Sequence, residues 1–160
     1  MQAKGYGLTG RWTWLYPITL TLHLLEELWA AGGYHPWLAS HGGAAMSTVS
    51  FLALTGAGVV ALSAGLALLR EDWLQWLVMG LAFFYLVNTA AHLIECLLTH
   101  SFSPGSFSGV LLWLPLALFT LSRTRQRHGR IPAWGRLLAL TLGGQAVLTF
   151  SLWRPLLWQG

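Results

Sequence analysis

The chain has 160 residues, of which 55% are hydrophobic and 9% are charged, and its formal net charge is +4. Soluble domains carry roughly 25% charged residues, so this composition indicates a small polytopic membrane protein rather than a soluble domain. The arginines lie beside hydrophobic segments rather than along a stripe, which argues against nucleic acid as a partner. The single cysteine, Cys96, excludes an internal disulfide and a cysteine-based zinc motif.

Five hydrophobic segments are candidate membrane spans, since a helix needs about 20 mainly apolar residues to cross a bilayer. In chain order they are roughly 12–31, 45–69, 73–99, 108–122 and 134–156. Glycine and proline mark the breaks after the first and third segments. We therefore expect an all-α fold: a polytopic transmembrane helical bundle of about five spans, forming a single integral-membrane domain over residues 1–160.

The basic residues predict the topology. Lys4 and Arg11 precede the first segment, and Arg70 lies between the second and third. The link from the fourth segment to the fifth is surrounded by Arg123, Arg125, Arg127, Arg130 and Arg136. The loops 32–44 and 100–107 contain no lysine or arginine. By the positive-inside rule, the N-terminus is cytoplasmic and the C-terminus is outside. The expected localisation is a bacterial inner (plasma) membrane.

The first segment carries His23, Glu26 and Glu27 among apolar residues. A carboxylate at bilayer depth costs about 2.5–3.5 kcal/mol on insertion scales, so it usually faces a partner, a cavity or a metal. At about 100° per residue, both carboxylates lie one helical turn after the imidazole and on the same face as it. A lone intramembrane histidine is usually a packing group, but several costly carboxylates are hard to explain by packing alone.

The third segment repeats the pair of a histidine with a glutamate three residues later. Asn88, His92 and Glu95 occupy an arc of about 60°, with Tyr85 near the same stripe. Because the first and third segments run in the same direction, both pairs can share one depth in the outer half of the bilayer. We expect the two polar faces to converge on one pocket, with His100 reaching it from the outer end of the third segment.

Imidazole and carboxylate groups are typical ligands of zinc, iron and manganese. The predicted ligands of one or two divalent ions, zinc or iron, are His23, Glu26, Glu27, His92, Glu95 and His100. The predicted catalytic residues are Glu26, Glu27, Glu95 and Asn88, of which Asn88 would orient a ligand or a bound water. Tyr85 and Trp113 are the candidates for lining a substrate pocket. The carboxylates are one short of the dinuclear pattern of helical bundles, so the number of ions stays open.

Three groups of residues resemble a known family: the run His23-Leu24-Leu25-Glu26-Glu27, the later Asn88-x-x-x-His92-x-x-Glu95, and the Pro104-Gly105 turn before a leucine-rich segment. Together they resemble the HXXEE-domain integral membrane proteins, over about residues 15–122. The resemblance implies that the histidines, glutamates and asparagine of these motifs form the functional centre, with a suspected enzymatic role. It supplies no substrate.

Three functions remain open. The leading hypothesis is a metal-dependent membrane hydrolase or oxidoreductase that activates water or dioxygen against a membrane lipid or lipophilic small molecule, a role in lipid metabolism. A metal-free acid/base isomerase or cyclase, similar to sterol isomerases, could use Trp113 and Tyr85 to steady a carbocation. A metal or proton transporter is less favoured, because polar residues are scarce in the cytoplasmic half. The small-residue stripe of Ala57, Ala61 and Gly65 serves an internal contact or a homo-oligomer.

Overall fold

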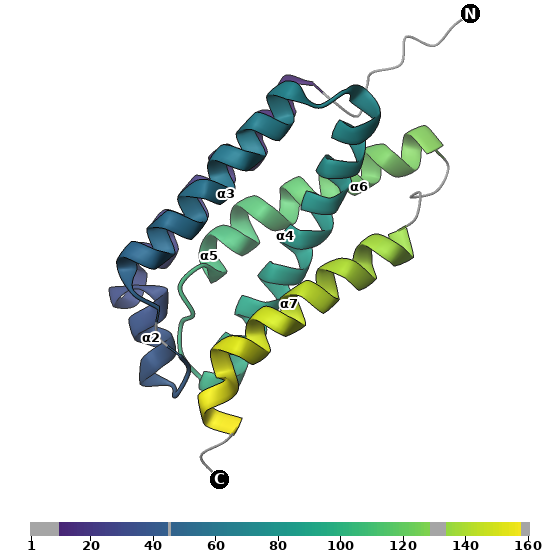
Figure 1. Ribbon diagram of the computed structural model, residues 1–160. Helices are drawn as coiled ribbons and strands as arrows, with labels where there is room; N and C mark the ends of the chain where they lie inside the picture. Colours follow the sequence, from purple (N-terminus) through teal and green to yellow (C-terminus); the bar gives the residue numbers. More distant parts are fainter. Residues whose placement is uncertain (1–9, 45, 129–133, 158–160) are drawn as a thin grey trace, which may run out of the picture.

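The structure, a computed structural model, describes residues 10–44, 46–128 and 134–157, and within these ranges it is all-helical, without strands (Figure 1). The all-α class is therefore confirmed. The longer helices are α1 (Leu15–Trp29), α3 (Thr48–Leu68), α4 (Glu71–Thr99), α6 (Leu114–His128) and α7 (Trp134–Leu157). The shorter ones are η1 (Arg11–Trp14), η2 (Ala30–Gly32), α2 (Tyr34–Ser40), α5 (Ser106–Ser108) and the π-helical turn η3 (Gly109–Trp113). Lys4 and Arg130 lie outside the described residues.

Three helical segments are long and apolar enough to cross a membrane: Thr48–Leu68, Glu71–Thr99 and Ser106–Gln126. They correspond to the second, third and fourth predicted spans. The first of them, α3, leaves Val49, Val60 and Leu68 more than two thirds exposed. Exposed branched side chains along a whole helix are typical of a surface that meets lipid tails, which are as apolar as the side chains themselves. The described chain thus has the character of a membrane protein.

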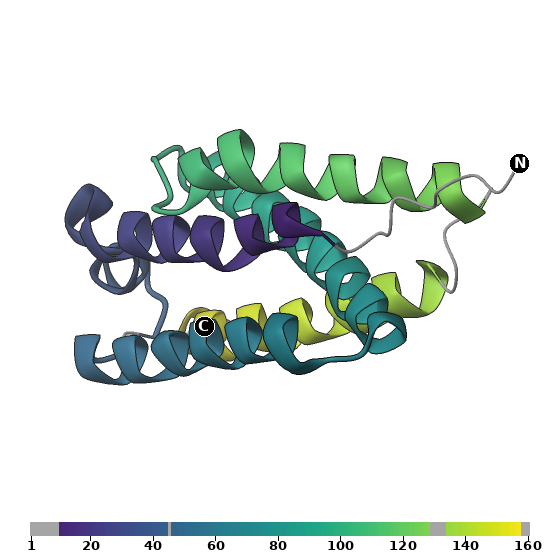
Figure 2. The same cartoon turned by 90° about the horizontal axis from the view of Figure 1, so that it is seen from above.

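Helix α4 lies at the centre of the bundle. Figure 2 shows it crossing between α6 on one side and α3 and α7 on the other, while α1 runs beside α6. Glu71 and Asp72 occupy its first turn, where negative charge is favourable for the helix dipole. At its other end His100 adopts a left-handed conformation with φ of 51°, which stops the helix and turns the chain back towards α5.

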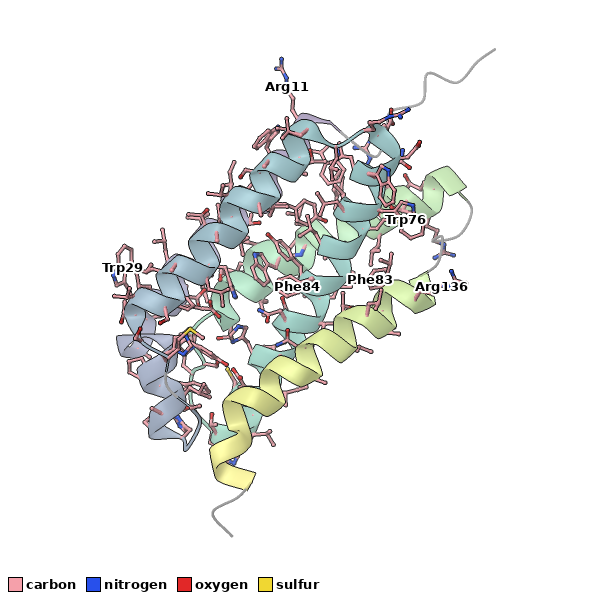
Figure 3. The ribbon with its side chains drawn as sticks, in the orientation of Figure 1. Arg11, Trp29, Trp76, Phe83, Phe84 and Arg136 are labelled. Carbon is pink, nitrogen blue, oxygen red and sulfur yellow. The ribbon has the colours of Figure 1, made fainter. Side chains whose placement is uncertain are left out.

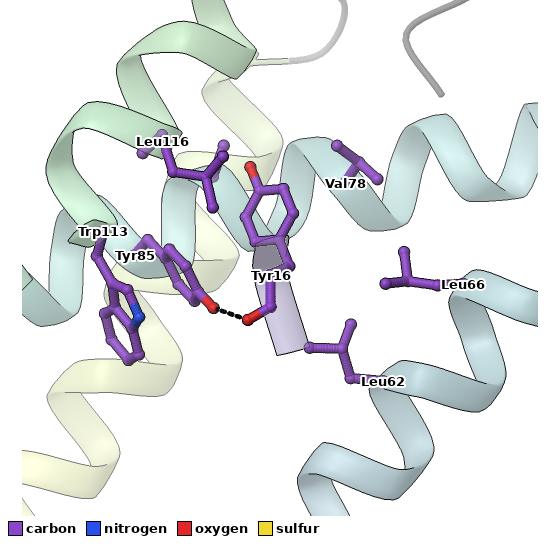
Figure 4. Packing of buried hydrophobic residues seen from close by; sticks show 9 residues of the cluster. Tyr16, Leu62, Leu66, Val78, Tyr85, Trp113 and Leu116 are labelled. Atoms are coloured by element: carbon purple, nitrogen blue, oxygen red, sulfur yellow. Dashed lines mark hydrogen bonds between the residues drawn. The ribbon is translucent and has the colours of Figure 1, made fainter. Parts of the chain in front are cut away.

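A buried hydrogen-bonded pair of tyrosines sets the register of α1 against α4 (Figure 4). The Tyr85 hydroxyl donates to the backbone oxygen of Tyr16 at 2.6 Å, and both side chains are fully buried in the largest apolar cluster. Seven residues later on each helix, about two turns on the same face, lie His23 and His92. Because the two helices run in the same direction from this contact, the two histidines reach the same level of the bundle.

The range 32–44 was predicted to be a loop, and that prediction is wrong in part, because Tyr34–Ser40 forms α2. Pro36 does not prevent this helix, since it lies in the first turn, where backbone N–H groups have no intrahelical partner. Gly33 enters the helix with φ of 102°. Buried Trp37 then ties α2 to the end of α4, its indole nitrogen donating to Ser101 Oγ at 3.1 Å.

The ends of the helices that carry the basic residues gather at one side of the molecule. In Figure 1 the start of α1, the turn from α3 to α4, and the end of α6 lie towards one end, and α2 and α5 lie towards the other. Figure 3 shows Arg11 and Trp29, from before and at the end of α1, projecting from opposite ends of the bundle. The polar residues of α1 and α4 described below lie towards the α2 and α5 end.

Candidate functional site

His23 of α1 and His92 of α4 lie side by side in the interior. They are 1% and 4% exposed, and their ring centroids are 5.3 Å apart. Glu27, one turn after His23, places its Oε1 atom 3.5 Å from Nε2 of His23 and 3.3 Å from Nε2 of His92. One ligand atom from each of the three side chains lies within 4.8 Å of the others. We call these residues the His–Glu triad, and it could hold a metal ion.

Two serines hold the outer nitrogens of the two imidazoles. Ser108 Oγ lies 2.8 Å from Nδ1 of His23, and Ser103 Oγ lies 3.0 Å from Nδ1 of His92. Each serine hydroxyl has its own acceptor elsewhere: Ser103 donates to Glu95 Oε2 at 2.7 Å, and Ser108 donates to the Gly105 carbonyl at 3.4 Å. Ser103 therefore accepts from Nδ1 of His92, whereas either atom can donate in the bond between Ser108 and Nδ1 of His23. The Nε2 atom of each ring faces the Glu27 carboxylate, as a lone pair when the ring is neutral and as an N–H donor when it is protonated.

Gly105 closes the site from the side of the serines. Its φ is +101°, and a Cβ built on it would lie 2.8 Å from Nε2 of His92 and 2.9 Å from Cε1 of His23. Only a residue without a side chain fits this backbone conformation and this close approach. We call residues 103–108 the serine–glycine loop, and it packs directly on both imidazoles.

Glu26 was predicted to be a metal ligand, but the structure places it on the serine–glycine loop instead. Its carboxylate accepts backbone N–H bonds from Gly105, Phe107 and Ser108 at 3.0, 3.1 and 2.7 Å. The first N–H groups of a helix have no intrahelical partner, and an acidic side chain satisfies them well. Glu26 and Glu27 are adjacent in the chain and lie about 100° apart around the helix, so the two carboxylates contact different neighbours.

Glu95 was also predicted to be a ligand, and it lies behind His92 rather than in the triad. Its Oε2 atom is 3.3 Å from Nδ1 of His92, the nitrogen that faces away from Glu27. Its Oε1 atom accepts from the Tyr34 hydroxyl at 2.8 Å. Burial, with the Glu95 carboxylate beside it, raises the pKa of Tyr34, so the phenol stays protonated and donates. Glu95 therefore anchors His92 and α2 to each other.

The remaining predicted polar residues lie at different distances from the triad. The Asn88 side-chain nitrogen is 3.5 Å from Nε2 of His23, the ring nitrogen that also faces Glu27. His100 is exposed at the end of α4 and is not part of the triad. It lies eight residues after His92, about 80° around the helix and roughly 12 Å along it, which explains the separation.

Tyr85 and Trp113, the residues predicted to line a substrate pocket, form a stack under His23. The His23 and Trp113 rings are 3.7 Å apart, and the Trp113 and Tyr85 rings are 3.9 Å apart. Both aromatic side chains are buried, and the Trp113 indole nitrogen is buried without a hydrogen-bond partner among the described residues. Trp113 ends the π-helical turn η3, a kind of turn that often occurs at functional sites.

Several residues of the site were not predicted from the sequence: Tyr34, Ser103, Gly105 and Ser108. Pro104-Gly105 was noted only as a turn, although the serines that flank it carry a detectable signal, because hydroxyl side chains beside a turn often bond to neighbouring groups. Tyr34 carries no such signal. Its role follows only from the packing of α2 against α4.

Comparisons with known proteins identify the family of this site. A family model described as "Protein of unknown function with HXXEE motif" matches residues 14–120, about two thirds of the chain. The matched range includes the His–Glu triad and the serine–glycine loop, and it ends before α7. Neither a curated protein nor a solved structure matches the chain. The triad combines His23 and Glu27 of the matched motif on α1 with His92 on α4. The chain belongs to the HXXEE family.

Proposed function

We propose that this chain is a metal-dependent integral-membrane enzyme, and that the His–Glu triad binds one divalent ion. The observation that carries the proposal is the meeting of three electron-pair donors in a buried place. Nε2 of His23, Nε2 of His92 and the Glu27 carboxylate face one another, while both Nδ1 atoms are held by serines. When both imidazoles are neutral, their lone pairs and the carboxylate repel one another in a low-dielectric interior, and a cation shared by the three groups removes the repulsion.

The distances agree with a shared ion. The separations of 3.3 and 3.5 Å between Glu27 and the two imidazoles exceed the 2.7–3.2 Å of an ordinary N–H···O bond. Ligand atoms bound to one tetrahedral ion at about 2.0–2.2 Å lie roughly 3.3–3.6 Å apart. Ligating histidines also bond their other ring nitrogen to a nearby polar group, and both Nδ1 atoms here lie within 3.0 Å of a serine hydroxyl.

The ligand set favours one ion, zinc or iron. Two histidines and one carboxylate are typical both of catalytic zinc sites and of non-haem iron oxygenases, which keep further positions open for substrate or water. A second ion is disfavoured, because Glu26 and Glu95 already accept hydrogen bonds from the serine–glycine loop and Tyr34. A zinc ion would favour hydrolysis, and an iron ion would favour oxidation.

The side chains around the triad have separate tasks in this proposal. A bound divalent ion supplies Lewis acidity and activates water or dioxygen. Asn88, beside His23, orients the molecule that reacts. Ser103, Ser108 and Glu95 hold the imidazoles in one tautomer and one orientation. The Trp113 ring covers one face of His23 and excludes water from it.

Metal analysis of the purified protein tests the proposal. We expect about one equivalent of zinc or iron in the wild type when chelators are avoided, and none in His92→Ala. His100→Ala is the matched control, because His100 is exposed and outside the triad. Wild-type protein without bound metal after supplementation with each ion, or a loss of metal in the control that equals the loss in His92→Ala, contradicts the proposal.

The membrane arrangement that goes with this function has five spans, a cytoplasmic N-terminus and an external C-terminus, with the triad in the outer half. The three candidate spans support its second, third and fourth spans, while α1 and α7 are not among the candidate spans of the described residues. The placement of the basic residues supports the orientation. An alkaline phosphatase fused to the C-terminus, which is active only outside the cytoplasm, is expected to be active. An inactive fusion that is stably expressed contradicts the topology but does not test the metal site.

A metal-free acid/base isomerase remains a second candidate because of the stack of His23, Trp113 and Tyr85. Aromatic faces stabilise a nearby cation, and a carboxylate such as Glu27 can transfer a proton. The two candidates differ in one measurement. Turnover of a lipophilic substrate that survives removal of all metal supports the isomerase, and turnover that returns only on adding zinc or iron supports the metal enzyme.

A further inference from the structure

A cavity of about 790 Å³ lies between α4 and α7, on the other side of α4 from the serine–glycine loop. Figures 1 and 2 both show α7 running beside α4. The volume falls within the roughly 300–1,000 Å³ of cavities that take one drug-sized or lipid-sized molecule. Its wall is mainly aliphatic, with Leu86, Ile94 and Leu142 among the lining residues. It suits an apolar chain.

One polar side chain of α7 interrupts this apolar wall. Gln145 lines the cavity, and its Oε1 atom is buried without a hydrogen-bond partner among the described residues. A buried amide oxygen without a partner is destabilising, so such groups in native proteins usually meet a ligand or a water. A hydroxyl group can donate and accept, so it matches the amide whichever way the amide is turned.

The charges of the wall restrict the kind of molecule further. Glu95 is the carboxylate that reaches the cavity, and no lysine or arginine is among the lining residues that the structure describes. His41 also lines the cavity, but its two ring nitrogens already contact the Trp37 carbonyl oxygen and Ser101 Oγ. An anionic head group, such as that of a fatty acid or a phospholipid, would thus enter an apolar space beside a carboxylate and without a lysine or arginine. A neutral head group avoids this cost.

From these three observations we infer that the α4–α7 cavity binds a neutral lipid alcohol, with its hydroxyl group on Gln145. The cavity also reaches the triad's surroundings, because Glu95 lines it and contacts His92 at 3.3 Å on its other side. If the proposed function holds, this alcohol belongs to the class of the substrate. The binding itself depends on the cavity alone.

The test compares three probes with one chain length and different ends: dodecanol, dodecanoate and dodecane. Displacement of tritiated dodecanol from the protein in lipid nanodiscs measures each affinity. We expect dodecanol to bind roughly three- to tenfold more tightly than dodecane, as one net hydrogen bond provides, and dodecanoate to bind more weakly than dodecanol. Saturable binding of dodecanol that is no tighter than that of either other probe overturns the inference, as does an absence of saturable binding.

Two variants locate the site, with one matched control. Gln145→Leu is expected to abolish the difference between dodecanol and dodecane, and Gln126→Leu, exposed at the end of α6, is expected to preserve it. Ala90→Trp fills the cavity from its exposed position on α4 and is expected to weaken all three probes at least tenfold. Undiminished dodecanol binding in both cavity variants overturns the inference.

The metal site and the cavity can fail separately in these measurements. Ala90→Trp is expected to retain its metal, whereas His92→Ala is expected to lose the metal and still bind dodecanol. A protein that binds dodecanol without ever binding metal supports the cavity and contradicts the proposed function. A protein that binds metal but shows no preference for dodecanol supports the proposed function and contradicts the inference about the cavity.

Discussion

The His–Glu triad and the serine–glycine loop are in contact, but their polar groups are satisfied in different ways. In the loop, donors meet acceptors, since the Glu26 carboxylate accepts three backbone N–H bonds. In the triad, the Glu27 carboxylate faces the Nε2 atoms of two imidazoles at 3.3 and 3.5 Å, longer than the bonds of the loop. Two adjacent residues of one motif therefore have different tasks. Glu26 stabilises the structure around the site, and Glu27 provides a place for a ligand.

The largest effect is expected for Gly105→Ala, because Gly105 belongs to the serine–glycine loop and lies directly against both imidazoles of the triad. The added Cβ would collide with both imidazoles at 2.8–2.9 Å, at a backbone φ that alanine rarely adopts. We expect loss of the bound metal and a lower temperature of unfolding in detergent. Gly56→Ala, on α3 with nothing within 4 Å of the new Cβ, is the control and is expected to match the wild type. A Gly105→Ala protein that keeps its full metal content contradicts the claim that the close contact of Gly105 with the imidazoles is needed for metal binding.

Glu27→Gln separates the triad from the loop. The variant keeps the size of the side chain and removes its negative charge, so metal affinity is expected to fall by more than the roughly 10–100-fold that partners of metal ligands contribute. With neutral imidazoles, the free energy of unfolding without metal is expected to change little, because the repulsion between acceptors is relieved. A large loss of stability instead indicates that Glu27 forms an ion pair with a protonated histidine. Competition with a chelator measures the affinity. Unchanged affinity means that Glu27 is not a ligand.

Glu26→Gln is the complementary substitution at the next residue. An amide in this place would direct one N–H group towards a backbone donor of the loop, which costs about 1–3 kcal/mol. We expect a loss of that size in the free energy of unfolding by SDS, followed through tryptophan fluorescence, and retention of one metal equivalent. If Glu26→Gln loses its metal while its stability is unchanged, the assigned tasks of the two glutamates are reversed.

Ser108→Ala tests how the loop acts on the triad. Without the hydroxyl, Nδ1 of His23 loses its partner at 2.8 Å, and the imidazole is no longer held in one tautomer. Metal affinity is expected to fall about 10–100-fold. Ser122→Ala, exposed on α6, serves as the control in the same chelator titration. Equal affinities in the two variants contradict the role of Ser108.

The smallest effect is expected for Tyr34→Phe, which removes one hydrogen bond to Glu95. Because burial raises the pKa of Tyr34, the hydroxyl donates throughout the neutral range, so the loss is independent of pH there. We expect a decrease of about 0.5–1.5 kcal/mol in the free energy of unfolding and a small decrease in metal affinity. A pH-dependent difference from the wild type between pH 6 and 9 contradicts this account.

The sequence predicted the parts of the site that follow from one helix at a time. The spacing of His23 and Glu27, and of Asn88, His92 and Glu95, places each set on one helical face, and helix periodicity is a local property. The convergence of the two histidines also followed, because α1 and α4 run in the same direction. His100 was expected to reach the pocket, but it lies outside the triad. The sequence did not show that His100 would itself adopt the left-handed conformation that ends α4.

The sequence alone thus determined the all-α class, the approximate long helices and the helical faces that carry His23, Glu27 and His92, since hydrophobic length and helical spacing depend on near neighbours in the chain. Only the tertiary structure decided that Glu26 would bind the serine–glycine loop, that Glu95 would pair with Tyr34, and that Gln145 would line a cavity beside α4. Those partners come from segments that are distant in sequence. Which of two neighbouring carboxylates meets them depends on how the helices pack.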